Sequence, residues 1–280
     1  MARAQNPSSS SASRSPGHSR VRAAPRVESD DYFTLSRRPL YALVVLTPLV
    51  ALYEVLAIAH LTNTKDQTQL TIKAENMLGQ MFKVFSVTGL LAPALLMLTV
   101  LLIWHVLSKD RWAIRPGVVA GMFVESVLWA LPLLVLGAVV LQVGAKVAPA
   151  AAALNAAGLA EELAARPWQA RLAISLGAGI YEELVFRLIG LAVLHIILRD
   201  LLRMPKLAAE VLAVLLTAVA FAFYHDVYAG GSGLAAIKWA DLSFFFAAGV
   251  YFAVLYLSRG FGIVVLCHAA YDIIVLLGRW

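Results

Sequence analysis

The sequence is poor in charged residues. Asp, Glu, Lys and Arg make up only 14% of its 280 residues, while hydrophobic residues make up 61% and the mean hydropathy is +0.78. A soluble domain of this length needs a larger charged share to cover its surface with water-binding groups. The scarcity of charge excludes a soluble globular protein and indicates a polytopic membrane protein.

Cysteine and internal repetition are also scarce. Cys267 is the single cysteine and lies in an apolar run, so no internal disulfide can form and the cysteine content does not identify the compartment. No internal repeat is evident, although a transporter built from inverted repeats would show one. Neither a disulfide-stabilised fold nor a repeat-built transporter is favoured.

The N-terminal residues 1–38 lack the apolar core of a secretory signal peptide. Their segment NPSSSSASRSPGHSR is rich in Ser, Arg and Pro and has almost nothing to bury. This composition predicts a disordered basic tail. The Arg- and Ser-rich, acid-poor start also has the composition of a transit peptide, but we favour a solvated cytoplasmic tail.

Seven apolar segments approach the roughly 20 residues that a membrane-spanning helix needs. They are residues 40–60, 85–107, 117–141, 172–198, 208–227, 241–257 and 261–278. The Ala-rich link 143–171 carries Glu161, Glu162 and Arg166, which suits an interfacial amphipathic helix. The sequence therefore predicts an all-α membrane bundle of seven transmembrane helices, or eight if this link also crosses.

Lys and Arg residues outside these spans are unevenly distributed, with 14 on the side of the tail and 8 on the other. Because basic residues concentrate on the cytoplasmic side, we expect a multi-pass integral membrane protein with its N-terminus in the cytoplasm. The expected organisation is a tail over 1–38, N-terminal transmembrane helices over 39–142, an interfacial segment over 143–171 and a catalytic core over 172–280.

Ionisable residues nevertheless occur inside the predicted spans. A charge at the bilayer centre costs about 2.5–3.5 kcal/mol on insertion scales, so such residues usually mark a function. The acidic ones are Glu54, Glu125, Glu182, Glu183, Asp226 and Asp272, and the basic ones are Arg187, His195, His225 and His268. We expect Glu54 and Glu125 to form hydrogen bonds between helices, and Asp226 and His195 to lie at helix ends.

Helical spacing sorts the residues of the fourth span. Glu183 and Arg187 are four residues apart, so they share a face and are predicted to form an ion pair. Glu182 is displaced by about 100° and has no partner on its own helix.

The same four-residue spacing recurs in two later helices. It relates Phe221 to His225 in FAFYH, and His268 to Asp272 in HAAYD. With Glu182, these residues suit hydrolysis. A carboxylate can take a proton from water, one histidine can hold that water, and a second can stabilise the developing oxyanion.

These motifs resemble the CPBP family of intramembrane proteases, named for CAAX processing and bacteriocin-immunity (Abi) proteins. Two glutamates followed after three residues by arginine correspond to Glu182, Glu183 and Arg187. Phenylalanine followed after three residues by histidine corresponds to Phe221 and His225. The third motif is similar to FAAGVYFAVLYLSRGFGIVVLCHAAYD, with Phe246, Gly249, Gly260, His268 and Asp272 in the matching places.

The resemblance implies roles for individual residues. Glu182 would be the general base on the hydrolytic water with help from His225, and Glu183 with Arg187 would hold the fourth helix in place. His268 and position 272 would bind the oxyanion. Asn is usual at position 272, whereas an ionised Asp272 has no proton to donate. Asp272 would then either stay protonated, or orient His268 and keep it cationic.

A zinc site built from Glu182, His225 and His268 is the alternative to a mechanism without a cofactor. No span has the HExxH spacing that indicates zinc from sequence, so we favour the metal-free mechanism that the resemblance implies. The expected substrate is a membrane-anchored protein or peptide in the lipid bilayer, with no nucleic-acid partner. A non-catalytic immunity or scaffold protein of the same fold is the alternative function, and a proton-coupled transporter is a third.

Overall fold

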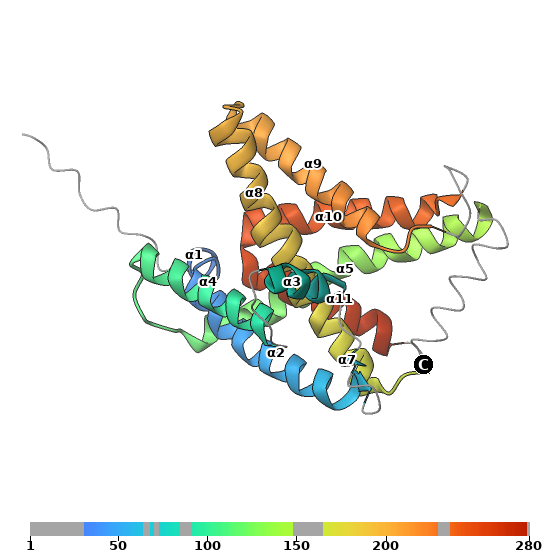
Figure 1. Ribbon diagram of the computed structural model, residues 1–280, viewed down its shortest axis with the longest axis horizontal. Helices are drawn as coiled ribbons and strands as arrows, with labels where there is room; N and C mark the ends of the chain where they lie inside the picture. Colours follow the sequence, from blue (N-terminus) through green and yellow to red (C-terminus); the bar gives the residue numbers. More distant parts are fainter. Residues whose placement is uncertain are drawn as a thin grey trace, which may run out of the picture. The chain divides into compact units, whose positions relative to one another are not determined.

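The computed structural model describes residues 31–63, 68–69, 73–84, 91–147, 165–228 and 236–278. Within these residues the chain is almost entirely helical (Figure 1). The long helices are α2 (Pro39–His60), α4 (Ala92–Ser108), α5 (Pro116–Val147), α9 (Lys206–Tyr224), α10 (Trp239–Arg259) and α11 (Phe261–Leu277). The minor elements are α1 (Tyr32–Leu35), α3 (Lys73–Val84) and two short antiparallel strands, β1 (Thr62–Asn63) and β2 (Thr68–Gln69).

Residues 168–201 form one continuous helix that contains π-helical turns. It consists of α7 (Trp168–Gly177), η1 (Ala178–Glu182), η2 (Leu184–Gly190), α8 (Leu191–His195) and η3 (Ile196–Leu201). The residues at the junctions keep helical dihedral angles, so the axis continues through each change of hydrogen-bonding pattern. Because π-helical turns often occur at functional sites, their presence around Glu182 is notable.

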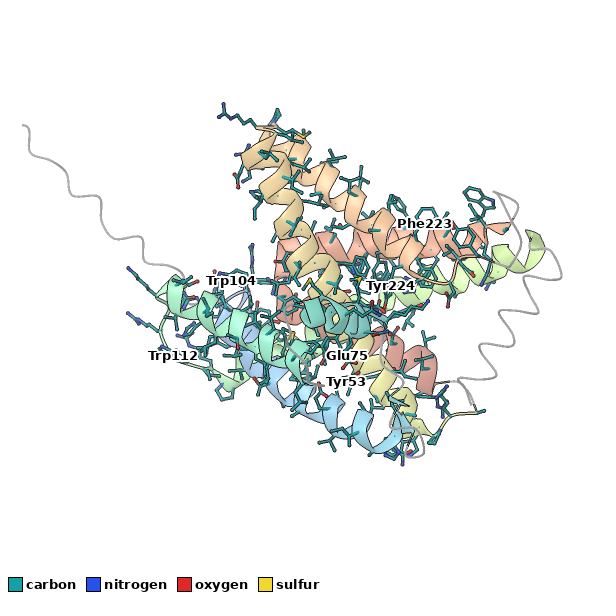
Figure 2. All side chains as sticks on the ribbon, viewed as in Figure 1. Tyr53, Glu75, Trp104, Trp112, Phe223 and Tyr224 are labelled. Carbon is teal, nitrogen blue, oxygen red and sulfur yellow. The ribbon has the colours of Figure 1, made fainter. Side chains whose placement is uncertain are left out.

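The seven predicted spans correspond to α2, α4, α5, the 168–201 helix, α9, α10 and α11. Four described helices are long and apolar enough to cross a membrane, namely Pro39–His60, Pro116–Val140, Lys206–Tyr224 and Trp239–Arg259, while α4 and α11 are shorter apolar helices. Large apolar side chains are exposed on the outside of the described helices, such as Trp104 on α4 and Phe223 on α9, and Trp112 is exposed in the link between α4 and α5 (Figure 2). The prediction of an all-α integral membrane protein is confirmed.

Two predicted segments fall largely outside the described residues. Residues 1–30 of the tail do so, and the expectation of an unstructured tail up to residue 38 is wrong at its end, because α1 forms there with Asp31 capping its first turn. Residues 148–164 of the predicted interfacial segment also lie outside, while its two ends continue α5 and begin α7. The interfacial helix stays a prediction.

Small residues allow the helices of the core to pack closely. A Cβ on Gly249 of α10 would lie 2.9 Å from Cα of Ala218 on α9, and a Cβ on Gly179 of η1 would lie 2.8 Å from the backbone nitrogen of Ala269 on α11. Ala253, one turn after Gly249, is fully buried. As in other membrane bundles, small side chains bring the backbones together, here at the helices that carry the ionisable residues.

Glu125 forms the interhelical contact expected of it. The Arg259 guanidinium, at the end of α10, donates to Glu125 on α5 through Nε at 2.5 Å and through Nη2 at 2.9 Å, and the Tyr32 hydroxyl of α1 donates to the same carboxylate. Gly260 follows with a φ of +88°, which favours glycine, and turns the chain into α11. This ion pair fixes the α10–α11 corner to α5.

Gly179→Ala is expected to destabilise the protein. The added methyl group would meet backbone atoms of α11 that cannot move independently, and overpacking of this kind costs about 1–3 kcal/mol. We expect a lower melting temperature in detergent. Gly117→Ala in α5 is the matched control, because a Cβ there has nothing within 4 Å, so its melting temperature should equal or exceed that of wild type. Equal melting of both variants would contradict the close contact between η1 and α11.

Candidate functional site

The candidate site forms where η1, the end of α9 and α11 meet. Glu182 is the last residue of η1, His225 follows α9, and His268 lies in α11. The Glu182 Oε2 atom is 3.7 Å from Nε2 of His225 and 3.9 Å from Nε2 of His268. This oxygen is buried and accepts no hydrogen bond from any residue that the structure describes. The three side chains expected to act together therefore converge on one atom.

His225 is oriented by the chain that precedes it. Its Nδ1–H donates to the Phe221 carbonyl at 2.8 Å, and this leaves Nε2 directed at Glu182. The Phe245 ring of α10 stacks on the imidazole at 3.8 Å with an angle of 15° between the planes. The carbonyl of residue 221 would be present whatever its side chain, but the Phe221 ring also contacts the imidazole, with the ring centres 4.7 Å apart, so the spacing in FAFYH places both contacts on His225.

His268 is oriented by Glu183. Its Nδ1–H donates to Oε1 of Glu183 at 2.7 Å, and the Phe252 ring stacks on the imidazole at 4.6 Å. The other ring nitrogen, Nε2, faces Glu182 and lies 3.7 Å from Oδ2 of Asp272. The sequence predicted no contact between Glu183 and His268, because the spacing of residues within one helix does not report contacts between helices.

The predicted ion pair of Glu183 and Arg187 is confirmed, with Nη1 3.1 Å from Oε1 and both side chains at most 1% exposed. Arg187 also donates from Nη2 to the Gly249 carbonyl at 3.3 Å, and its guanidinium lies 4.2 Å from the centre of the Phe221 ring. Arg187 therefore connects the fourth helix to both α9 and α10. The motif that contains Phe221 and the motif that contains Gly249 therefore both contact the Arg187 side chain.

Asp272 makes a weaker contact with His268 than Glu183 does. Its distance of 3.7 Å from Nε2 is longer than a hydrogen bond, whereas Glu183 holds Nδ1 directly. Asp272 is also partly exposed, with 21% of its side chain accessible. Glu183, and not Asp272, orients the imidazole in this arrangement.

A second buried polar cluster lies beside η1. The Tyr181 hydroxyl donates to Oε1 of Glu54 on α2 at 2.9 Å, as expected for an interhelical hydrogen bond, and the Tyr53 hydroxyl donates to Glu75 of α3. The rings of Tyr53 and Tyr181 are in edge-to-face contact at 5.3 Å. Tyr181 directly precedes Glu182, so this cluster fixes the turn that carries Glu182 against α2 and α3.

Helix α3 reaches the site with its first turn. The Lys73 Nζ atom is 2.8 Å from Oδ1 of Asp226, the residue after His225. Asp226 lies two residues beyond the end of α9, so it is a helix-end residue as expected. The hydrogen bond from Lys73 lowers the pKa of Asp226. The Tyr224 side chain lies close to both Glu182 and the backbone of Ala74. Sequence reasoning placed neither α3 nor Tyr224 at the site, since no motif contains them.

Phe246, the first residue of the third motif, does not reach the histidines. It lines a shallow apolar pocket with Val219 and Trp239, while its neighbour Phe245 stacks on His225. His195 lies on α8 and is likewise outside the group around Glu182. Among the described residues, no group of three His, Cys, Asp or Glu side chains is arranged to hold a metal ion.

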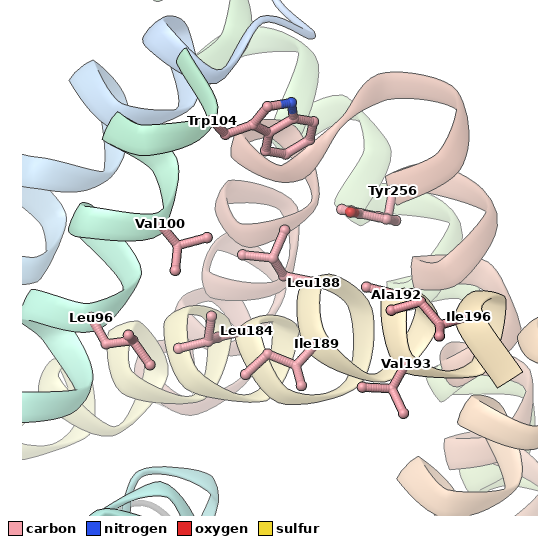
Figure 3. Close-up of a pocket in the computed structure, with 10 residues that line it drawn as sticks. All are labelled: Leu96, Val100, Trp104, Leu184, Leu188, Ile189, Ala192, Val193, Ile196 and Tyr256. Carbon is pink, nitrogen blue, oxygen red and sulfur yellow. The ribbon is translucent and has the colours of Figure 1, made fainter. Parts of the chain in front are cut away.

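An apolar groove of about 510 Å³ lies along residues 184–196 of the 168–201 helix. Figure 3 shows residues of α4 on one side and residues of η2 and α8 on the other, with Tyr256 of α10 beside them. Leu184, directly after Glu183, is one of its lining residues, and the lining is almost wholly apolar. The groove offers space for a hydrocarbon chain.

One family model matches part of the chain. Residues 164–274 match the family model described as Type II CAAX prenyl endopeptidase Rce1-like. No curated protein and no solved structure gives a significant match to the chain. The matched range contains Glu182, His225, His268 and Asp272, and it excludes α2, α3, α4 and α5.

The two adjacent glutamates are expected to differ sharply in their effect on stability. Removing the Glu183 charge leaves Arg187 buried without its counter-ion, and breaking a buried pair typically costs about 3–5 kcal/mol. Glu183→Gln should therefore melt at a much lower temperature in detergent. Glu182→Gln, at the neighbouring position, should melt close to wild type, because Oε2 of Glu182 accepts no hydrogen bond in the described structure and the nearly isosteric amide can keep the hydrogen bond with Tyr224. Similar melting temperatures would contradict the assigned division of roles.

Proposed function

We propose that this membrane protein is an intramembrane endopeptidase that uses Glu182 as its general base, because residues 164–274 match the family model described as Type II CAAX prenyl endopeptidase Rce1-like. The observation that carries the proposal is the buried Oε2 atom of Glu182, which faces the Nε2 atoms of two histidines at 3.7 and 3.9 Å. Both distances exceed a direct hydrogen bond and suit a bridging water.

In the proposed reaction, a water bound between Glu182 and His225 is the nucleophile. Glu182 takes a proton from this water as its oxygen attacks the carbonyl carbon of the scissile peptide bond. Nδ1 of His225 donates to the Phe221 carbonyl, so the neutral ring accepts a hydrogen bond at Nε2 and orients the water. The carbonyl oxygen becomes an oxyanion as the tetrahedral intermediate forms.

His268 is the proposed oxyanion donor. An imidazolium has two N–H groups; one donates to Glu183, and the other, on Nε2, is available to the oxyanion. The carboxylates of Glu182, Glu183 and Asp272 surround this ring and compensate its charge. Collapse of the intermediate breaks the C–N bond, and Glu182 returns its proton to the leaving amine. Asp272 is proposed to balance charge and not to donate a hydrogen bond.

The proposed substrate is a protein or peptide that is itself attached to the membrane. The description of the matching family names CAAX prenyl substrates. The apolar groove next to Leu184 supports an anchored substrate, because its lining suits a hydrocarbon chain and offers a hydrophilic peptide almost nothing to bind. The peptide segment next to the anchor would then lie across Glu182.

Glu182→Gln is expected to abolish cleavage while the protein stays folded. The amide is nearly isosteric but cannot accept the proton of the water, and loss of a general base lowers the rate by roughly 10²–10⁴-fold. The measurement is cleavage of a lipid-anchored peptide by the purified protein in detergent or liposomes. Glu210→Gln, in the exposed pair of Lys206 and Glu210, is the matched control and should cleave normally. Normal cleavage by Glu182→Gln would rule out Glu182 as the general base.

Cleavage is also expected to survive metal removal. The proposed reaction needs only side chains and water, and Glu182, His225 and His268 do not form a metal-binding group in the described structure. The test is to dialyse the protein against EDTA and then assay it with and without added zinc. Unchanged rates support the metal-free mechanism, whereas loss of activity that zinc restores would support the zinc alternative.

A further inference from the structure

Tyr224 links Glu182 to helix α3. It is the last residue of α9, and its side chain is hydrogen-bonded to the Glu182 side chain and to the backbone of Ala74. The Tyr224 ring lies edge to face with the rings of His225 and Phe186, with the ring centres 5.2 Å apart in both cases. Two neighbouring rings therefore hold the Tyr224 side chain in place, and its hydroxyl ends at the candidate general base.

The two hydrogen bonds of the Tyr224 hydroxyl have a defined direction. An ionised carboxylate can only accept, so the single hydrogen of the hydroxyl is donated to Glu182, and the backbone of Ala74 contributes its N–H. Ala74 is the second residue of α3, and the first four N–H groups of a helix have no partner within that helix. Tyr224 thus gives this helix-start N–H an acceptor, and the N–H in turn directs the hydroxyl hydrogen toward Glu182.

The first turn of α3 is held at the residues on both sides of Ala74. The Lys73 Nζ atom lies 2.8 Å from Oδ1 of Asp226, and the buried Glu75 side chain accepts a hydrogen bond from the Tyr53 hydroxyl of α2 (Figure 2). Three consecutive residues of α3 therefore each bind a residue outside α3, so the N–H of the middle residue has a fixed place. This support comes from a part of the chain that the family match does not cover.

The Glu182 carboxylate is not oriented by the histidines that it faces. Its Oε2 atom is 3.7 Å from Nε2 of His225 and 3.9 Å from Nε2 of His268, and both distances are too long for a direct hydrogen bond. We propose that Tyr224 is a positioning residue, whose hydroxyl, held by the N–H of Ala74, keeps the carboxylate turned toward the two histidines. The inference rests on the proposed protease function, and it adds α3 to the parts of the chain that the reaction requires.

The proposed role predicts an effect on the chemical step alone. A carboxylate without this hydrogen bond would spend less time in the orientation that takes a proton from the water, and misplacement of reacting groups can lower a rate by up to about 10²-fold. Tyr224 acts through Glu182 and contacts no substrate in the proposed reaction. Its loss should therefore lower kcat and leave KM unchanged.

The test is Tyr224→Phe, which removes the hydroxyl and keeps the ring. Its kcat for cleavage of a lipid-anchored peptide is expected to be about ten- to a hundredfold lower than that of wild type, with the same KM. Tyr251→Phe is the matched control, because the Tyr251 hydroxyl of α10 donates to the Trp129 carbonyl of α5 at 2.6 Å and so also joins two helices. This variant should keep the wild-type kcat, and the two variants should melt at similar temperatures in detergent.

A double variant separates a positioning role from a structural one. If Tyr224 acts through Glu182, adding Tyr224→Phe to Glu182→Gln should not lower the residual rate further, because the base is already absent. The role of Tyr224 is refuted, while the protease function stands, if Tyr224→Phe keeps a kcat within about twofold of wild type, if Tyr251→Phe loses as much, or if the double variant is slower than Glu182→Gln. If wild type cleaves no lipid-anchored peptide, the proposed function fails and the role of Tyr224 fails with it.

Discussion

The arrangement of the site depends on the buried carboxylate of Glu183. Its Oε1 atom binds both the Arg187 guanidinium and Nδ1 of His268, and the Glu183 side chain is fully buried. A buried charge is tolerated only when opposite charges and hydrogen bonds compensate it. Here the compensation comes from its own helix and from α11, and Arg187 extends it to the Gly249 carbonyl on α10. One electrostatic requirement thereby holds three helices together around the candidate site.

The need to compensate a buried charge distinguishes the two neighbouring glutamates, Glu182 and Glu183. Glu183 is held by charged partners and is part of the scaffold, while Glu182 faces Nε2 of His225 and His268 with an oxygen that accepts no hydrogen bond in the described structure. Phenylalanine rings then determine the ring planes of the histidines, since Phe245 stacks on His225 and Phe252 stacks on His268. The result is a fixed set of polar groups inside an apolar bundle, the kind of preorganisation that the proposed reaction would use.

The helices that lie outside the matched domain also support the site. Glu54 on α2 binds Tyr181, the residue before Glu182, and Lys73 on α3 binds Asp226, the residue after His225. These contacts explain why charges occur in a part of the chain that carries no recognisable motif. The expectation that Glu54 and Glu125 bond to other helices is confirmed, because a carboxylate in an apolar span must find a partner on another helix.

By itself, the sequence determined the membrane class, the seven apolar helices and the pairing of Glu183 with Arg187, because hydropathy and four-residue spacing are local properties of the chain. It also singled out Glu182, His225 and His268, since unpaired ionisable groups are costly in lipid. Only the tertiary structure decided that Glu183 orients His268, that Phe245 and not Phe246 packs on His225, and that α3 reaches Asp226. Those contacts join residues 20 to 153 positions apart, and helical periodicity within one segment carries no information about which faces of separate helices meet.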